Sequence, residues 1–153
     1  MKHTVVIPLY NKEAFIYDTI RSLAFQEKKA SQIIIVDDFS TDQSMFLLKD
    51  ALSFFAPQFL LTEVEVIELK ENKGPGHARN IGMELATGDL ISFLDADDLL
   101  AQDCLENRIL KIQNTNFDFV ITDIQMPEID GFMFLEKLRN SPDIYYRNHI
   151  ENG

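Results

Sequence analysis

The sequence is poor in cysteine and in positive charge, and it has no tryptophan. Cys104 is the single cysteine of the 153 residues, which excludes an internal disulfide and a cysteine-based zinc site. No stretch is apolar over the length that a membrane-spanning helix needs, and the first residues show no signal-peptide cleavage region. These absences predict a cytoplasmic protein without a transmembrane segment.

Lysine and arginine number 14, against 25 aspartates and glutamates, so the formal net charge is −11. No basic patch offsets this charge, and nucleic acid is therefore not an expected partner. An acidic protein that binds phosphates usually does so through a metal cation. The length, with 46% hydrophobic residues, predicts one domain over residues 1–153 with a sizeable core.

Apolar, β-branched runs alternate with segments of helical periodicity along the chain. The strands are expected at residues 4–9, 33–36, 62–69, 90–94 and 117–124, and helical patterns follow each of them, the last at residues 132–139. Leu90 to Leu94 form an apolar run interrupted only by Ser92, which predicts a buried central strand. In residues 62–69 glutamates alternate with apolar side chains, which predicts a strand near a sheet edge. Short connections predict an α/β fold: a doubly wound, mostly parallel, Rossmann-like sheet with helices on both faces.

Two local signals mark helix ends in this pattern. Ser40 to Gln43 match a capping box that opens the second helix. Gly88 is positioned as the C-terminal cap of the third helix.

Acidic side chains follow two of the expected strands directly. Asp37 and Asp38 end the second strand, and Asp95, Asp97 and Asp98 follow the fourth. Carboxylates packed this closely repel one another unless a positive charge is present, and a hard divalent cation, Mn²⁺ or Mg²⁺, is the simplest partner. The alternative is a solvated acidic turn in which Asp98 caps the next helix.

Further polar and aromatic residues fall at the same sheet edge, because parallel strands bring their carboxyl ends together. These residues are Pro8 near the end of the first strand, Tyr10 and Asn11 directly after it, and Lys73, Gly74 and Arg79 at the start of the third helix. Together with the acids they are the parts needed to hold a nucleoside diphosphate. Each also has a structural alternative: Tyr10 packs, Asp38 caps, Gly74 only turns, or Arg79 pairs with a surface acid.

Four segments, at residues 5–13, 33–42, 72–82 and 88–98, resemble the motifs of the family 2 glycosyltransferases with the GT-A fold. The resemblance covers about residues 3–112 and implies a truncated GT-A core that binds a nucleoside-diphosphate sugar, preferably a UDP-sugar, for transfer to an unknown acceptor. It implies a nucleoside pocket lined by Pro8, Tyr10 and Asn11, with Asp38 on the base, Asp37 behind it, and Lys73, Gly74 and Arg79 toward the nucleotide. Asp95 would lie near the ribose or donor sugar, and Asp97, with Asp95, would bind Mn²⁺ or Mg²⁺.

Residues 117–139 instead resemble the phospho-acceptor strand and following helix of response-regulator receiver domains, with Asp123 as the phosphorylated residue. The sequence therefore divides into a glycosyltransferase-like part at 1–112, a receiver-like unit at 113–142 and a tail at 143–153. The alternatives to a glycosyltransferase are a signalling module phosphorylated on Asp123 and a non-catalytic chimeric or designed protein. No carboxylate after Asp98 stands in a recognisable acceptor loop, so a catalytic base is not identified.

Overall fold

The computed structural model of the chain describes residues 1–113, which lie within one compact unit. The elements are β1 (His3–Leu9), α1 (Ile16–Ala24), β2 (Gln32–Asp37), α2 (Ser44–Phe54), the 3₁₀ helix η1 (Ala56–Phe59), β3 (Glu63–Glu68), α3 (Pro75–Leu85), β4 (Leu90–Phe93) and α4 (Cys104–Gln113). The strand expected at 117–124, the helix at 132–139, the receiver-like unit with Asp123 and the tail lie outside the described residues. No helix of the described part is long and apolar enough to cross a membrane.

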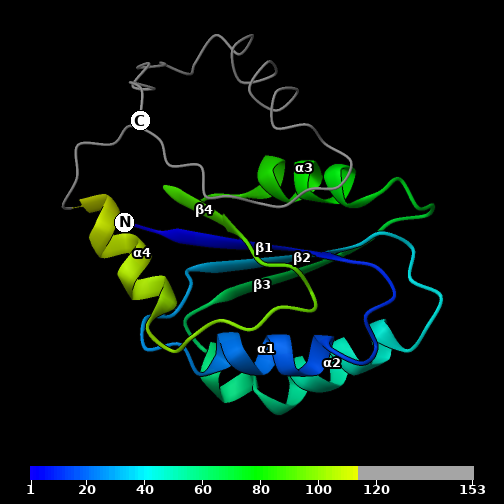
Figure 1. The fold of residues 1–153 in the computed structure, drawn as a ribbon, viewed down its shortest axis with the longest axis horizontal. Coiled ribbons are helices and arrows are strands. Elements are labelled where there is room, and N and C mark those ends of the chain that lie inside the picture. The colour runs from blue at the N-terminus through cyan, green and yellow to red at the C-terminus, as the bar shows by residue number, and fades with distance from the viewer. Residues whose placement is uncertain (114–153) are drawn as a thin grey trace, which may run out of the picture. The chain divides into compact units, whose positions relative to one another are not determined.

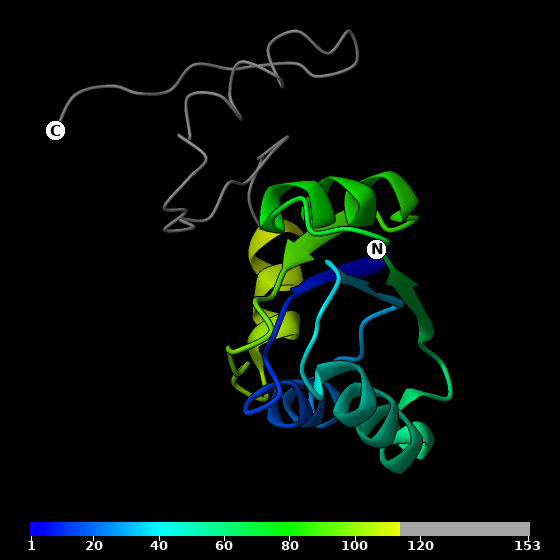
Figure 2. The same ribbon diagram turned by 90° about the vertical axis from the view of Figure 1, so that its right-hand side faces the viewer.

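The four described strands form one sheet in the order β3-β2-β1-β4, and each neighbouring pair is parallel. Helix α3 covers one face of this sheet, and α1 and α2 cover the other (Figures 1 and 2). The predicted α/β fold, with a parallel sheet and helices on both faces, is confirmed.

The two faces of the sheet are buried in two separate clusters because side chains alternate along a strand. On one face Val5, Ile7 and Leu9 of β1 pack against α1 and α2, where Ile16 and Ile20 are also fully buried. On the other face Val6, Ile34 and Val36 meet Ala78 of α3. The central strands are therefore buried on both sides, which accounts for their continuous apolar sequence.

Strand β4 differs from its prediction. Within the described sheet it lies at an edge and pairs only with β1, and Ile91 is 37% exposed. The apolar run thus predicts a strand, but within the described residues that strand is neither buried along its length nor flanked by strands on both sides. The edge position expected for residues 62–69 is confirmed by β3, whose Glu63 and Glu68 are exposed.

Both predicted helix caps are wrong. Helix α2 begins after Gln43 without a side-chain cap of the predicted kind, because Ser40 instead accepts a hydrogen bond from the backbone of Asn11. Helix α3 ends before Ala86, and the role of Gly88 is a close approach to β1. A Cβ atom at Gly88 would lie 2.7 Å from both N and Oγ1 of Thr4.

Candidate functional site at the carboxyl edge of the sheet

All four described strands end at one edge of the sheet, where the loops that follow them lie near one another. This edge is at the right of Figure 1 and faces the viewer in Figure 2. The loops after β1 and β2 begin at Tyr10 and Asp38, the loop after β3 leads to Gly74, and the loop after β4 carries Asp95 and Asp97. The structure thus brings the predicted site residues to one edge.

The loops after β1 and β2 are joined by hydrogen bonds. The backbone N–H of Asn11 donates to Ser40 Oγ (3.0 Å), and Asn11 Oδ1 accepts the N–H of Thr41 (2.8 Å). Glu13 Oε2 accepts the N–H of Gln43 (2.9 Å), and the N–H of Glu13 donates to Asp42 (3.1 Å). These bonds fix the two loops relative to each other before any ligand binds.

Two residues of these joined loops, Asn11 (φ 49°) and Phe39 (φ 67°), adopt left-handed backbone conformations. Asparagine tolerates this region and phenylalanine does not favour it, so the surrounding bonds must hold the loop in place. Phe39 and Tyr10 leave 48% and 44% of their surface exposed. They supply aromatic surface at the sheet edge.

Asp42 illustrates the electrostatics of the joined loops. Burial raises the pKa of its carboxyl, but hydrogen bonds from the Ser44 hydroxyl, the Ser44 N–H and the Glu13 N–H outweigh this effect. The pKa of Asp42 consequently lies below its ordinary value, and the carboxylate stays charged.

Asp37 and Asp38 are buried, with 4% and 2% of their surface exposed. Asp37 accepts the backbone N–H of Ser40 at 3.2 Å. Asp38 accepts two backbone N–H groups, those of Lys73 (2.8 Å) and Gly74 (2.6 Å). Asp38 therefore ties the start of α3 to the end of β2.

Gly74 and Lys73 form the entry to α3. Gly74 has φ 87°, which glycine adopts without steric cost, and it is the N-cap residue of the helix. The ammonium of Lys73 lies 2.8 Å from Glu71, and its hydrogen bond and charge lower the pKa of that exposed carboxyl. The ammonium of Lys73 thus pairs with Glu71 in the loop between β3 and α3 and not with a residue at a strand end.

The two aspartates after β4 are each paired with a cation from another element. Arg79 of α3 donates from Nη2 to Asp95 Oδ1 at 2.6 Å. Lys12, after β1, donates from Nζ to Asp97 Oδ2 at 2.6 Å. Arg79 is largely buried, and its Nε has no hydrogen-bond partner among the described residues. The structure thus places two carboxylates, two cations and an unpaired buried donor together.

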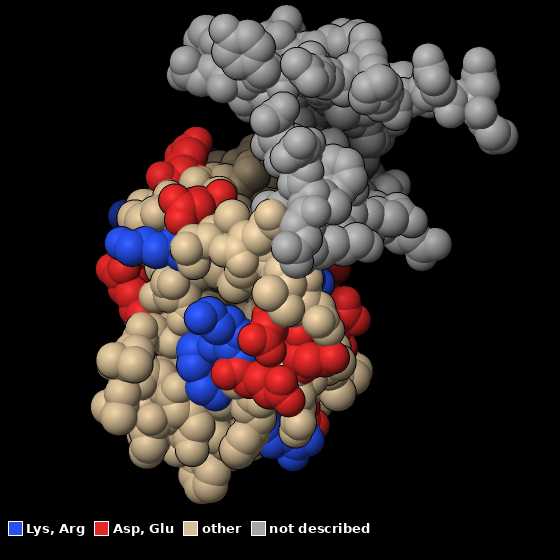
Figure 3. All heavy atoms as spheres, turned by 90° about the vertical axis from the view of Figure 1, so that its left-hand side faces the viewer, with Lys and Arg blue, Asp and Glu red and all other residues tan. Residues whose placement is uncertain are grey.

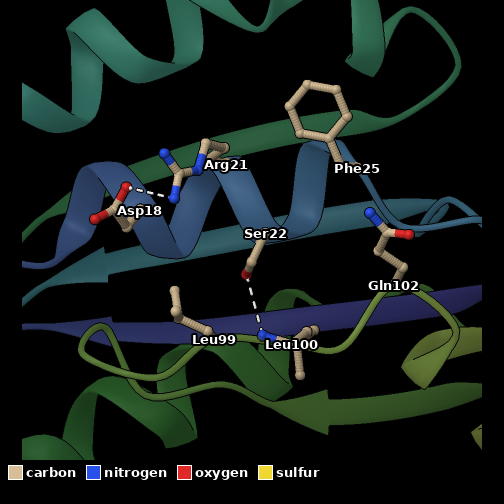
Figure 4. Close-up of a pocket in the computed structure, with 7 residues that line it drawn as sticks. All are labelled: Asp18, Arg21, Ser22, Phe25, Leu99, Leu100 and Gln102. Carbon is tan, nitrogen blue, oxygen red and sulfur yellow. Dashed lines mark hydrogen bonds and ion pairs between the residues drawn. The ribbon is translucent and has the colours of Figure 1, made fainter.

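Residues 96–105, which include Asp97 and the chain that follows it, are held by hydrogen bonds from α1 and from Gln26 just beyond it. Thr19 Oγ1 donates to the carbonyl of Ala96 (2.9 Å), and Ser22 Oγ accepts the N–H of Leu100 (3.2 Å). The buried amide of Gln26 donates to Ala101 (2.7 Å) and accepts from Leu105 (3.2 Å). Figure 4 shows the Ser22 contact between α1 and this loop.

A pocket of about 230 Å³ also lies between α1 and this loop, lined by Asp18, Arg21, Ser22, Phe25, Leu99, Leu100 and Gln102 (Figure 4). It contains none of the predicted site residues. Arg21 is paired with Asp18 at 3.1 Å, so neither charge is directed at a ligand. The candidate site remains the edge at the strand ends.

The carboxylates at this edge fit a divalent cation whose coordination is completed by the phosphates of a bound ligand. Among the described residues no group of three or more His, Cys, Asp or Glu side chains could form a complete metal cage. Mg²⁺ and similar ions are commonly held by one or two carboxylates together with substrate phosphates. Asp97 and Asp95, about 39% and 41% exposed at their side chains, offer that partial set.

The opposite side of the molecule, nearest the start of β1, is shown in Figure 3. On the part of this face that the described residues form, acidic and basic side chains stand next to one another. No continuous basic surface of described residues appears there.

The chain matches the profile of the glycosyl transferase family 2 over residues 4–151 and therefore belongs to this family. The predicted family is confirmed. The match extends past residue 112, where the resemblance was expected to end, and it includes residues 117–139.

Known relatives agree with this assignment. An uncharacterized glycosyltransferase from Haemophilus influenzae is 32% identical over 138 residues, which cover 82% of this chain and 50% of that protein. The poly(ribitol-phosphate) beta-N-acetylglucosaminyltransferase TarS from Staphylococcus aureus is 30% identical over 86% of this chain and 22% of its own length. The chain thus spans half or less of the length of these relatives.

Solved structures share the fold. The structure of Staphylococcus aureus TarS 1–349 in complex with UDP-GlcNAc has a TM-score of 0.65 and 27% identity, covering 80% of this chain and 37% of that one. The mannosyltransferase PcManGT from Pyrobaculum calidifontis, in complex with GDP-Man and Mn²⁺, has a TM-score of 0.60 and 28% identity, covering 71% and 31%. The described sheet is therefore of the GT-A, Rossmann-like type.

Sequence reasoning identified neither Lys12 as the partner of Asp97 nor Thr19 as the residue that holds the backbone of the aspartate segment, residues 95–98. Lys12 lies 85 positions from Asp97, and Thr19 lies 77 positions from Ala96. The position of Lys12, directly after a strand end and among predicted ligand residues, was the signal that could have identified it. Thr19 stands on the buried face of α1 and gives no comparable signal.

Proposed function

We propose that the carboxyl edge of the sheet binds a nucleoside-diphosphate sugar together with a divalent cation, as the donor site of a glycosyltransferase. The observation that carries this proposal is the pairing of Arg79 with Asp95 and of Lys12 with Asp97 at one edge. The two carboxylates suit a divalent metal cation, and the two basic side chains suit the phosphates of a ligand that this metal holds.

The nucleoside is assigned to the joined loops after β1 and β2. Tyr10 and Asn11 follow β1 on this side, and the exposed ring of Tyr10 provides a surface for the base. Pro8, which was also expected to line the pocket, is buried within β1. Asp38, with Asp37 behind it, holds the N–H of Gly74 beside this surface. A contact of Asp38 with the base requires the ligand to reach a carboxylate that is 2% exposed and whose two oxygens already accept the N–H groups of Lys73 and Gly74.

The diphosphate is assigned to the space between α3 and the aspartates. Arg79 presents a buried Nε without a described partner, and Lys73 and Gly74 directly precede α3, whose N-terminus favours negative charge. Asp97, with Asp95, is assigned the divalent cation. When bound, this cation neutralises charge on the departing nucleoside diphosphate.

The proposed donor is a UDP-sugar and the proposed cation is Mn²⁺ or Mg²⁺. TarS has been solved with UDP-GlcNAc, and PcManGT with GDP-Man and Mn²⁺. Both are similar to this chain over most of its length, which supports a nucleotide-sugar donor but does not distinguish uridine from guanosine.

The signalling alternative is less favoured. In that interpretation Asp37 and Asp38 would bind Mg²⁺ beside Asp123. The carboxylate of Asp38 instead accepts the N–H groups of Lys73 and Gly74, and Asp37 accepts that of Ser40. The family match also covers residue 123.

Isothermal titration calorimetry of the full chain with UDP, GDP and UDP-GlcNAc, with and without Mn²⁺, tests the proposal. We expect UDP to bind with Mn²⁺ present, and Asp97→Asn to weaken that binding about tenfold or more because a cation ligand is lost. Lack of binding by every nucleotide under both conditions would refute the proposed donor site. Binding of UDP without any effect of Mn²⁺ would refute the assignment of the cation alone.

A further inference from the structure

The ion pairs Arg79–Asp95 and Lys12–Asp97 differ in how firmly the basic side chain is held. The side chain of Arg79, a residue of α3, is only 10% exposed, so its burial fixes the guanidinium beside Asp95. The side chain of Lys12 is 36% exposed and that of Asp97 is 39% exposed. An exposed pair of this kind contributes little to stability and is readily exchanged.

The backbone of Lys12 is nonetheless fixed. Its N–H donates to Ser44 Oγ at 2.6 Å, and the neighbouring Asn11 and Glu13 bind the loop after β2. The flexible four-carbon stem of lysine can therefore move its ammonium while the loop keeps its position.

We propose that Lys12 is an exchangeable counter-ion of Asp97. Without ligand, Lys12 neutralises the carboxylate that is assigned to the divalent cation. With a nucleoside diphosphate and the cation bound, Lys12 leaves Asp97 and donates to a phosphate oxygen. The inference rests on the proposed donor site and concerns how that site is regulated.

The surroundings of Asp97 explain why such a counter-ion is needed. Asp95 and Asp98 lie within the same turn, in which the N–H of Asp98 donates to the carbonyl of Asp95 at 3.0 Å. Carboxylates at this spacing repel one another when no positive charge is near. Arg79 supplies the positive charge beside Asp95, and Lys12 supplies the one beside Asp97.

The exchange makes binding of cation and nucleotide cooperative. Cation alone must displace the ammonium of Lys12 without giving it another anion to bind. When the diphosphate is present, the displaced ammonium gains a new partner. Each ligand therefore raises the affinity for the other by the same factor, as linkage requires.

The test measures binding to the full chain in two separate titrations, Mn²⁺ alone, followed by electron paramagnetic resonance of the free ion, and UDP at saturating Mn²⁺. Lys12→Met removes the ammonium and keeps most of the stem. We expect it to bind Mn²⁺ alone about two- to fivefold more tightly, because an exposed ion pair no longer competes. We expect it to bind UDP about tenfold more weakly, because a charged hydrogen bond to phosphate is lost.

Two further variants complete the design. Lys12→Arg keeps the positive charge and is expected to leave the affinity for Mn²⁺ alone near that of the wild type. Lys49→Met removes the lysine of another exposed ion pair, with Glu68 at 2.9 Å, and is expected to change neither affinity. Opposite shifts for Mn²⁺ and UDP in Lys12→Met alone are the expected signature.

The outcomes separate this inference from the proposed function. If Asp97→Asn abolishes Mn²⁺ binding while Lys12→Met leaves it unchanged or weaker, the exchange is wrong and the donor site stands. If Lys12→Met binds UDP as tightly as the wild type, the transfer of Lys12 to phosphate is wrong. If neither wild type nor Lys12→Met binds Mn²⁺, the exchange is also wrong, whereas binding of UDP would still support the nucleotide site.

Discussion

Thr19 and Ala96, which are 77 positions apart in the sequence, are joined by a buried hydrogen bond from the threonine hydroxyl to the alanine carbonyl at 2.9 Å. Ala96 stands between Asp95 and Asp97 and is itself 1% exposed. The bond therefore fixes the backbone between Asp95 and Asp97, and with it the orientation of both carboxylates. Thr19 is a positioning residue in this arrangement, since its side chain faces away from the proposed ligand.

Thr19→Val is expected to reduce the free energy of unfolding by about 1 kcal/mol, because the Ala96 carbonyl loses its partner. It is also expected to weaken UDP binding in the presence of Mn²⁺ several-fold, as the aspartates become less well placed. Denaturant unfolding and calorimetry measure the two effects. Thr19→Ser keeps the hydroxyl and should restore the nucleotide affinity. Wild-type nucleotide affinity in Thr19→Val would show that the segment is positioned without this bond.

Asp38→Asn is expected to lower the free energy of unfolding by about 1–3 kcal/mol. The carboxylate accepts N–H groups with both oxygens, and an amide replaces one of these acceptors by a donor. Denaturant unfolding gives the stability, and hydrogen exchange at the Gly74 amide gives the local effect. Asp50→Asn, at an exposed position on α2, is the matched control. Unchanged exchange at Gly74 in Asp38→Asn would contradict the role of Asp38 in holding α3.

Gly82→Ala is expected to destabilise the protein by about 1–3 kcal/mol through overpacking. A Cβ atom at Gly82 would overlap Val6 Cγ1, which is fully buried in the central strand β1. Thermal or denaturant unfolding measures the change, and Glu84→Ala, at an exposed position of the same helix, is the control. A Gly82→Ala protein as stable as the wild type would show that α3 can move away from the sheet at no cost.

The sequence predicts the described fold well because its signals are local. Each apolar run marks a strand, each helical pattern marks a crossover, and the crossovers make the sheet parallel. The same logic places Tyr10, Asp38 and Asp97 at one edge before any coordinates are known. What it does not give is the position of β4 in the described sheet, because an apolar run of four or five residues does not distinguish a partly exposed edge strand from a buried central one.

The contacts within the site are less predictable because they depend on particular hydrogen bonds between distant residues. The bond from Thr41 to Asn11 spans 30 positions, and it makes Asn11 a link between loops as well as a candidate ligand. Ser40 was expected to cap α2, but its hydroxyl oxygen instead accepts a hydrogen bond from the Asn11 N–H. Residue type and spacing indicate which side chains reach the edge, but not which of them the loops themselves use.

His3 is expected to make the free energy of unfolding depend on pH. It is 1% exposed, and its Nε2 lies 2.8 Å from Ser92 Oγ. Burial, with a smaller contribution from the charge of Arg108, lowers its pKa from 6.5 to about 4. Between these two values the unfolded chain binds a proton that the native state does not, so the free energy of unfolding falls as the pH falls.

The contribution of His3 is absent above pH 6.5 and reaches about 3 kcal/mol of lost stability near pH 4. His3→Gln removes the titration and keeps a polar group beside Ser92. Denaturant unfolding between pH 7.5 and about pH 4 should show a shallower decline for the variant than for the wild type. Parallel curves for the two proteins would mean that His3 does not titrate on unfolding in this range.

The 153-residue chain is expected to bind a donor without transferring its sugar efficiently. Transfer requires a general base near the acceptor hydroxyl and a surface that orients the acceptor. Asp103 and Glu106, the carboxylates after Asp98 within the described residues, lie at the start of α4, and Gln102 beside them accepts the N–H of Glu27 beyond the end of α1. That is the side of the sheet where β2 begins, away from Asp97.

Within the described residues no carboxylate after Asp98 is placed near an acceptor, and we therefore expect slow, Mn²⁺-dependent hydrolysis of a UDP-sugar at most, measured as UDP release with and without an added sugar acceptor. Asp97→Asn should abolish the release, and Asp103→Asn and Glu106→Gln should leave it unchanged. Efficient transfer to an added acceptor, lost on substitution of one carboxylate within residues 99–153, would show that this part of the chain supplies the base. In that case the separation of donor binding from transfer would be wrong.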